Sequence, residues 1–283
     1  PPYREALIER DDEWGELETW RVIQRESSPY TLSYFVAALD LTYDENGSIV
    51  RVDEDRRIYV QLFIRTLWLS VVITALTLIL GFPIAYLMAH LRARYANLLM
   101  IMVLLPFWTS LLVRTSSWIV MLQQQGVLND IMVYSGLIGE DDRLLMVYNQ
   151  TGTIVAMTHI LLPFMVLPLY SIMKTIPPSY MRAARSLGAN QGTAFWRVYV
   201  PQTVAGIGAG GVLVFIIAIG YYITPALVGG QSGQMISNFI AFHMQRSLNW
   251  GLAAALGTIL LVTVIVLYYL YNKLIGVDRL KFG

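Results

Sequence analysis

Residues 177–201 read PPSYMRAARSLGANQGTAFWRVYVP and lie between two long apolar stretches. Pro177 and Pro178 open this segment, Gly188 interrupts it, and Pro201 closes it. Proline is favoured in the first turn of a helix, glycine just after the last turn, and proline beyond the end. These proline and glycine positions predict a helix, a turn and a second helix that ends at Pro201. Two short helices between membrane spans need an explanation.

Composition defines the fold class. Of the 283 residues, 56% are hydrophobic and only 14% are charged, against about 25% in a typical soluble domain. A bilayer-spanning helix needs about 20 mostly apolar residues. We therefore expect an all-α, polytopic helical membrane protein with five visible spans. The expected spans cover residues 64–89, 98–114, 153–173, 203–223 and 252–271.

Charge asymmetry predicts the orientation of these spans. Residues 1–60 hold fourteen acids against seven arginines, and residues 118–150 are also acid-rich. By contrast, residues 90–97 and 174–202 contain basic residues and no acid. The positive-inside rule then places the two basic loops in the cytoplasm and the two acidic segments outside. An external N-terminus leads us to expect one further span ahead of Pro1.

The predicted organisation has three parts. Residues 1–60 form an acidic extracytoplasmic segment, and residues 61–275 form a transmembrane domain that includes the cytoplasmic loop 174–202. Residues 276–283 form a net basic cytoplasmic tail. The chain has no cysteine, which excludes disulfides and thiolate metal sites.

The two helices predicted within 177–201 are too short to be stable alone, because isolated helices below about 12–15 residues are marginal in water. Apolar residues on both of them, such as Tyr180, Leu187 and Trp196, need something to pack against. The loop either folds back on the membrane face or docks on a partner.

The spacing within this loop resembles a known signature. Ala183-Ala184, three residues, Gly188, nine residues and Val198-Tyr199-Val200-Pro201 resemble the loop of bacterial ATP-binding-cassette importer permeases. In that family the loop runs Glu-Ala-Ala-x3-Gly-x9-Ile-x-Leu-Pro, so Arg182 stands here in place of Glu. The resemblance implies a type I importer permease fold with six spans in the bacterial inner membrane. It also implies that the loop couples this chain to a separate ATPase through Arg182, Ala183, Ala184, Gly188, Val198 and Pro201.

Three longer stretches narrow the resemblance. Residues 104–130, 162–171 and 211–230 resemble the spermidine/putrescine-type branch, which implies a polyamine solute. Another small solute, such as an amino acid derivative, is the alternative. The implied partners are ATPase subunits that hold ATP and Mg²⁺, a second permease subunit, an extracytoplasmic solute-binding protein and the lipid bilayer. The resemblance implies no enzymatic activity or cofactor in this chain and no nucleic-acid partner.

The expected spans contain no Asp or Glu, so a cationic solute would depend on a partner's acids or on aromatic faces. Trp108, Trp118, Tyr221 and Tyr222 are the candidate pathway residues, and a lipid-interface belt or helix packing is the alternative role. Residues Gly220 and Pro225 around the tyrosine pair predict irregular backbone.

Three further polar residues have ordinary explanations. Arg65 and Arg114 fall at predicted span ends, where their side chains reach the interface. We expect His159 to be a hydrogen-bonded packing residue rather than a metal ligand, because no second ligand lies at suitable spacing. Gly206 and Gly210 form a GxxxG spacing for close helix approach, either within the chain or with a second permease.

Two other classes of protein remain as alternatives at this point. A secondary transporter or channel subunit usually has intramembrane acids and paired broken helices, and the acids are lacking here. A purely structural membrane subunit would not need the cytoplasmic loop. The chain contains no G-x-x-x-x-G-K-[ST] motif, so any ATP that drives transport is bound elsewhere.

Overall fold

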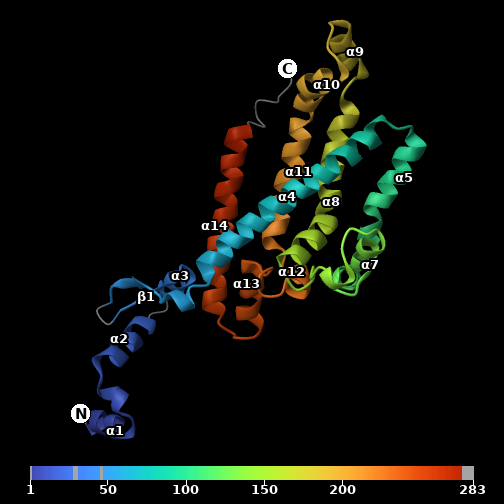
Figure 1. Cartoon of the computed structure of the whole chain (residues 1–283). Coiled ribbons are helices and arrows are strands. Elements are labelled where there is room, and N and C mark those ends of the chain that lie inside the picture. The colour runs from blue at the N-terminus through green and yellow to red at the C-terminus, as the bar shows by residue number, and fades with distance from the viewer. Residues whose placement is uncertain (1, 28–30, 45–46, 276–283) are drawn as a thin grey trace. The chain divides into compact units, whose positions relative to one another are not determined.

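A computed structural model describes residues 2–27, 31–44 and 47–275, and the predicted tail 276–283 lies outside them. Within this part of the chain, four helices are long and apolar enough to cross a membrane, and a bent helix pair makes up to five. The four long segments are Tyr59–His90, Gln150–Thr175, Gln191–Gly220 and Trp250–Lys273. The helical architecture in Figure 1 confirms the all-α polytopic membrane fold.

Contacts divide the chain into two compact units. The first contains residues 1–63 and 239–260, and the second contains residues 64–238 and 261–283. In the first unit, β1 and β2 form an antiparallel hairpin that pairs Leu41 with Arg51. The elements before the first long helix are α1 (Pro2–Arg10), η1 (Asp12–Gly15), α2 (Leu17–Glu26), α3 (Ser33–Ala38), β1 (Leu41–Tyr43), β2 (Ile49–Arg51) and η2 (Glu54–Arg56).

Asp40 connects this hairpin to the start of α4 (Tyr59–His90). Its carboxylate accepts hydrogen bonds from the backbone N–H groups of Ile58 (3.1 Å), Tyr59 (3.0 Å) and Val60 (2.8 Å). The first N–H groups of a helix have no partner within the helix, and a negative charge near them is favourable. Asp40 is buried and thus caps the helix from a distant position in the sequence.

We expect Asp40→Ala to lower the free energy of unfolding by about 1–3 kcal/mol, because it leaves N–H groups at the start of α4 without their acceptor. Thermal unfolding in detergent and amide exchange at residues 58–60 will measure the loss. Asp53→Ala is the control, since Asp53 is exposed and its side chain caps no helix. Equal losses in both variants would contradict the capping role.

The second unit is built around two neighbouring helices, α8 (Gln150–Thr175) and α11 (Val200–Gly220), which lie side by side in Figure 1. Leu161, Met165 and Leu169 of α8 are fully buried in its core. The other elements of the chain from α5 onward are α5 (Ala93–Leu104), η3 (Leu105–Trp108), α6 (Leu111–Leu122), α7 (Val127–Tyr134), η4 (Glu140–Asp142), α9 (Pro178–Ser186), α10 (Gln191–Ala194), η5 (Phe195–Tyr199), α12 (Ile223–Val228), α13 (Ile236–Gln245) and α14 (Trp250–Ile275).

The second expected span, 98–114, is not one continuous helix. The segments Ala93–Trp108 and Leu111–Tyr134 meet at an angle of 99°. Pro106 lacks an amide hydrogen, and Ser110 begins a new helix by accepting the N–H of Val113 at 3.2 Å. The acidic segment expected outside the membrane, residues 118–150, is therefore partly helical, over residues 118–122 and 127–134. Apolar composition predicts that a segment enters the membrane but does not show where the helix turns.

Small residues bring α8 and α11 together. A Cβ atom on Gly206 would lie 3.2 Å from the Leu169 Cα and the Pro168 carbonyl oxygen, and one on Gly210 would lie 2.8 Å from the Met165 sulfur. The GxxxG spacing thus serves packing within the chain, which resolves the alternative left open by the sequence. Gly211 has a different environment, since its nearest neighbour, a Thr74 methyl group, is 4.0 Å away.

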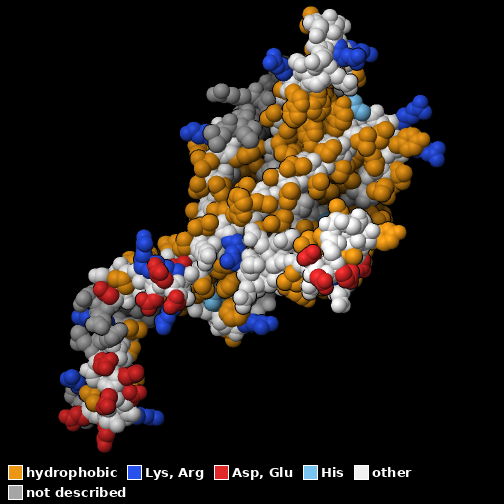
Figure 2. Space-filling view, viewed as in Figure 1, with side chains coloured by type: hydrophobic (Ala, Val, Ile, Leu, Met, Phe, Trp, Pro, Cys, Tyr) orange, Lys and Arg blue, Asp and Glu red, His pale blue; other side chains and the backbone are white. Residues whose placement is uncertain are grey.

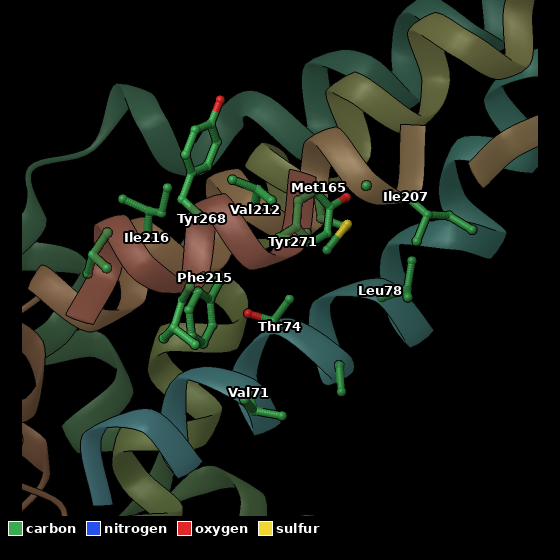
Figure 3. Close-up of a pocket in the computed structure, with 15 residues that line it drawn as sticks. Val71, Thr74, Leu78, Met165, Ile207, Val212, Phe215, Ile216, Tyr268 and Tyr271 are labelled. Carbon is green, nitrogen blue, oxygen red and sulfur yellow. The ribbon is translucent and has the colours of Figure 1, made fainter. Parts of the chain in front are cut away.

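Gly211 borders an apolar groove of about 420 Å³ between α4, α11 and α14. Figure 3 shows Thr74 of α4, Phe215 of α11 and Tyr271 of α14 around it.

We expect Gly206→Leu to destabilise the protein by about 1–3 kcal/mol through overpacking against the α8 backbone. Gly211→Leu is the matched control, because its side chain enters the groove. Thermal unfolding compares them, and an equal loss in the two variants would contradict the packing argument.

Candidate functional site

The loop between α8 and α11 begins with α9, which starts at Pro178. A glycine in the left-handed backbone conformation follows its last turn. Gly188 has φ of +91°. Its N–H donates to the Arg185 carbonyl at 3.0 Å, and the Ala189 N–H donates to the Ala184 carbonyl at 3.1 Å. These two bonds form a Schellman motif, which satisfies carbonyl groups at the end of the helix. The prediction that Gly188 ends the first helix is confirmed.

The surface of α9 has few partners within the chain. No residue of α9 is buried, and Arg182 and Ala183 are exposed whereas Ala184 is half-buried. Two large apolar side chains follow on the same loop, with Leu187 89% and Trp196 69% exposed. Apolar side chains of this size at such exposure, beside exposed arginines, form a surface suited to a protein partner. We call Tyr180, Arg182, Ala183, Leu187 and Trp196 the α9 surface.

The second helix of the loop does not end at Pro201. Residues Gln191–Gly220 form one continuous helical segment, which Asn190 begins by accepting the Thr193 N–H at 2.7 Å. The turn Phe195–Tyr199 is a π-helix, and Pro201 follows it as an exposed residue in the first turn of α11. Proline inside a helix clashes with the carbonyl four residues earlier, and the wider π-turn gives this carbonyl room. The predicted helix end at Pro201 was therefore wrong.

An aromatic cluster fixes the base of the loop to α4. The Tyr199 ring stacks on Phe195 with 5.7 Å between centroids, and it meets Tyr86 edge-on at 5.2 Å. The His90 and Tyr199 ring centroids are 5.5 Å apart, and Tyr199 is only 2% exposed. We did not predict this cluster. The four-residue spacing of Tyr86 and His90 on one helix face was the available signal.

The four predicted pathway residues lie in different environments. Trp108 is 89% exposed at the end of η3, whereas Trp118 donates from its indole Nε1 to His159 Nδ1 at 3.2 Å. The expectation that His159 is hydrogen-bonded is therefore confirmed. Arg114 borders the same groove as Trp118 and His159, rather than extending freely from a helix end.

Tyr221 and Tyr222 occupy a break between α11 and α12. The Tyr221 carbonyl accepts from the Ser237 hydroxyl at 2.7 Å, and the Tyr222 carbonyl accepts from the Asn238 side-chain amide at 2.8 Å. Side chains thus satisfy carbonyl groups that the interrupted helix leaves open. The predicted irregular backbone is confirmed, although α11 ends at Gly220 and the expected span extended to residue 223.

Charge is distributed unevenly over the second unit. Figure 2 shows lysine and arginine side chains near α9 and near the start of α5, and acidic side chains near α7 and η4. The exposed residues concerned are Arg92, Arg94, Lys174, Arg182, Arg185 and Arg197 in the first group, and Asp130, Glu140, Asp141 and Asp142 in the second. Over the ranges with described placement, no group of three His, Asp or Glu side chains is arranged to hold a metal ion.

Comparisons with known proteins agree with this arrangement. Residues 81–276 match the family described as binding-protein-dependent transport system inner membrane component. The spermidine/putrescine transport system permease protein PotB of Haemophilus influenzae is 36% identical over 222 residues, which is 77% of each chain. The inner membrane ABC transporter permease protein YdcU of Escherichia coli is 30% identical over 229 residues, covering 76% of this chain and 71% of that protein.

A solved structure has a similar fold. It is described as a bacterial ABC transporter involved in the import of the acidic polysaccharide alginate. Its chain aligns with a TM-score of 0.65 at 18% identity, over 98% of this chain and 96% of that chain. At this identity the likeness concerns the fold.

Proposed function

The chain belongs to the family of binding-protein-dependent transport system inner membrane components, and from this membership we propose how it works. It is a permease subunit of an ATP-binding-cassette importer and a multi-pass inner membrane protein, so the secondary transporter and channel alternatives do not hold. We propose that it lines the solute pathway together with a second permease subunit. A separate ATPase binds ATP and Mg²⁺ and drives transport, and an extracytoplasmic solute-binding protein delivers the solute.

The α9 surface is the observation that carries the coupling role. A nine-residue helix is marginal by itself, and α9 has no buried residue, although Met181 packs against the core of the second unit. Leu187 and Trp196 offer apolar contacts, and Arg182 adds a positive charge. Among the described residues, the ion pairs of the chain do not include Arg182, and we propose that it pairs with carboxylates of the partner. Arg182 thus fits an ATPase groove with an acidic rim.

Orientation follows from the charge asymmetry of the second unit. The basic groups near α9 and at the start of α5 face the cytoplasm, and the acidic groups near α7 and η4 face outside. The α9 surface is then on the side of the membrane where ATP is available. The N-terminal segment 1–60 and the C-terminal tail 276–283 lie outside and in the cytoplasm, respectively.

The solute that we propose is a polyamine. The support comes from relatives whose names specify spermidine and putrescine. Trp118 and the 40%-exposed Tyr222 offer aromatic faces that attract cations by about 0.5–2 kcal/mol each. An amino acid derivative is the alternative, because Arg114 introduces a positive charge beside Trp118.

The test is to produce the chain with the ATPase, second permease and binding protein encoded beside it. We expect the ATPase to co-purify, and reconstituted vesicles to accumulate labelled spermidine or putrescine only with internal ATP. Deletion of residues 179–200 should release the ATPase. Because the deletion also alters the fold, Leu187→Asp provides a second variant with a single exposed change. An ATPase that stays bound to both variants would contradict the coupling role.

A further inference from the structure

A groove of about 440 Å³ beside the bend between η3 and α6 contains a positive charge with no acid nearby in the sequence. Arg114, Trp118 and His159 border it. The full lining is Leu105, Pro106, Thr109, Val113, Arg114, Ser117, Trp118, Met121 and His159. Most of these residues are apolar, so the charge and the few polar groups decide what the groove binds.

The Arg114 guanidinium is only partly satisfied. Its Nη2 donates to the Thr109 carbonyl at 3.0 Å, and its Cζ lies 5.8 Å from the centre of the Phe107 ring. Its Nε is buried, and among the residues that the structure describes it has no acceptor. An arginine has five N–H donors and no acceptor, so most of its hydrogen-bonding capacity remains available.

His159 adds a second donor to the groove. The Trp118 indole N–H can only donate, so His159 Nδ1 must accept it at 3.2 Å. A neutral imidazole that accepts at Nδ1 carries its hydrogen on Nε2. His159 also borders a second groove of about 240 Å³ next to Pro163, so this residue lines both spaces.

The hydroxyl groups of the lining use their hydrogens on the backbone. The Thr109 hydroxyl donates to the Pro106 carbonyl at 2.8 Å, and the Ser117 hydroxyl donates to the Val113 carbonyl at 2.9 Å. The donors left for a ligand are therefore those of Arg114 and His159. No Asp or Glu occurs between Asp55 and Asp130 or between Asp142 and Asp278, so α4, α5, α6, α8 and α11 contain no acid. A charged group at membrane depth without a partner is costly.

We propose that this groove binds a carboxylate, held by the Arg114 guanidinium and by the Nε2–H of His159. The planar fork of arginine matches the two oxygens of a carboxylate. The carboxylate comes either from the second permease subunit or from a solute of the alternative class, an amino acid derivative, because a polyamine has no carboxylate. The inference goes beyond polyamine transport, because an unpaired Arg114 would repel a polycation and a bound carboxylate removes this repulsion.

The test uses the imidazole nitrogen signals of the chain in lipid nanodiscs. The sequence holds three histidines, so ¹⁵N-histidine spectra contain few signals, and His159→Gln assigns the one of interest. We expect the Nε2–H tautomer and a saturable shift on titration with sodium acetate, but not with sodium chloride at equal ionic strength. Arg114→Gln should weaken acetate binding about 10- to 100-fold, and Arg114→Lys should weaken it less.

The same ¹⁵N-histidine spectrum of the assembled transporter distinguishes the two sources of the carboxylate. A signal that is already shifted without acetate, and that returns in Arg114→Gln, indicates a carboxylate of the second permease. A signal that still responds to acetate indicates a site for the solute's carboxylate. Arg65→Gln is the matched control, since Arg65 donates to the Gln231 carbonyl at 2.9 Å and should leave the His159 titration unchanged.

The proposal is overturned if neither acetate nor assembly changes the His159 signal, or if Arg114→Gln responds as the wild type does. Both results are independent of whether polyamines are transported. Uptake assays with spermidine answer that question separately.

Discussion

Gly188→Val will separate ATP hydrolysis from solute uptake. Gly188 has φ of +91°, and apart from its chain neighbours no atom of the described residues lies within 4 Å of a Cβ at this position. The penalty is therefore backbone strain rather than crowding, and it amounts to about 1–2 kcal/mol for a residue with a Cβ. The loop relieves the strain by leaving the left-handed conformation, which breaks the hydrogen bonds of Gly188 and Ala189. Leu187 and Trp196 then no longer face a partner together.

Reconstituted transporter allows both rates to be measured in one preparation. We expect uptake to fall roughly 5- to 30-fold, which corresponds to 1–2 kcal/mol, while ATP hydrolysis continues. Gly192→Val is the matched control, because Gly192 lies in α10 and its nearest neighbour is the Asn190 side chain at 3.6 Å. Normal uptake in Gly188→Val, or an equal loss in Gly192→Val, would count against the coupling role of this turn.

Much of the fold follows from residue types alone. Apolar stretches long enough to cross a bilayer predicted the long helices, and α4 and α8 differ from the expected spans mainly in extra turns at their ends. Glycine and proline signals predicted the turn at Gly188 and the break at Tyr221 correctly, because each depends on the local backbone. A short sequence signal was sufficient where the backbone conformation depends only on neighbouring residues.

The missed features depend on contacts between distant residues. The bend near Pro106 and the helix that continues through Pro201 both involve a proline in an apolar segment. Pro106 lies where a helix ends, whereas Pro201 is accommodated within a continuous helical segment. The π-turn that accommodates Pro201 contains Phe195 and Tyr199, whose rings contact Tyr86 of α4. Similarly, Asp40 caps a helix from eighteen to twenty residues away. No single stretch of sequence contains this information.

The candidate functional sites also contain some features that local sequence predicts and others that depend on the fold. The exposure of α9 could be predicted in part, because apolar residues on a short helix need either the membrane face or a partner to pack against. The second helix of the loop, by contrast, continues into α11. The chemistry of the groove at Arg114 could not, since the sequence gives Arg114 and His159 separate, ordinary roles. Only the fold places the guanidinium and the imidazole on one groove. For the same reason, the sequence distinguished the tyrosine pair by the irregular backbone around it, but it did not show that Trp118 is hydrogen-bonded to His159.

Tyr199→Ala will be among the most destabilising single substitutions in the second unit. Tyr199 is 2% exposed and packs on Tyr86, His90 and Phe195. Removing a buried aromatic ring leaves a cavity and costs about 3–5 kcal/mol. The cluster also joins the loop to α4, so the α9 surface should lose its fixed position. We expect a lower unfolding temperature in detergent and reduced uptake even at temperatures where the protein remains folded.

Tyr199→Phe separates the ring from its hydroxyl group. The hydroxyl is buried and has no hydrogen-bond partner among the described residues, and an unsatisfied buried hydroxyl is unfavourable. Phenylalanine keeps the ring contacts and removes this cost, so we expect stability equal to or higher than that of the wild type, with normal uptake. Loss of uptake in Tyr199→Phe would instead indicate that the hydroxyl binds a group of the ATPase or a water molecule.

The unfolding temperature of Tyr199→Ala tests the cluster itself. If this variant unfolds at the wild-type temperature, then the aromatic cluster does not fix the loop, and the contacts of α9 with its partner must do so.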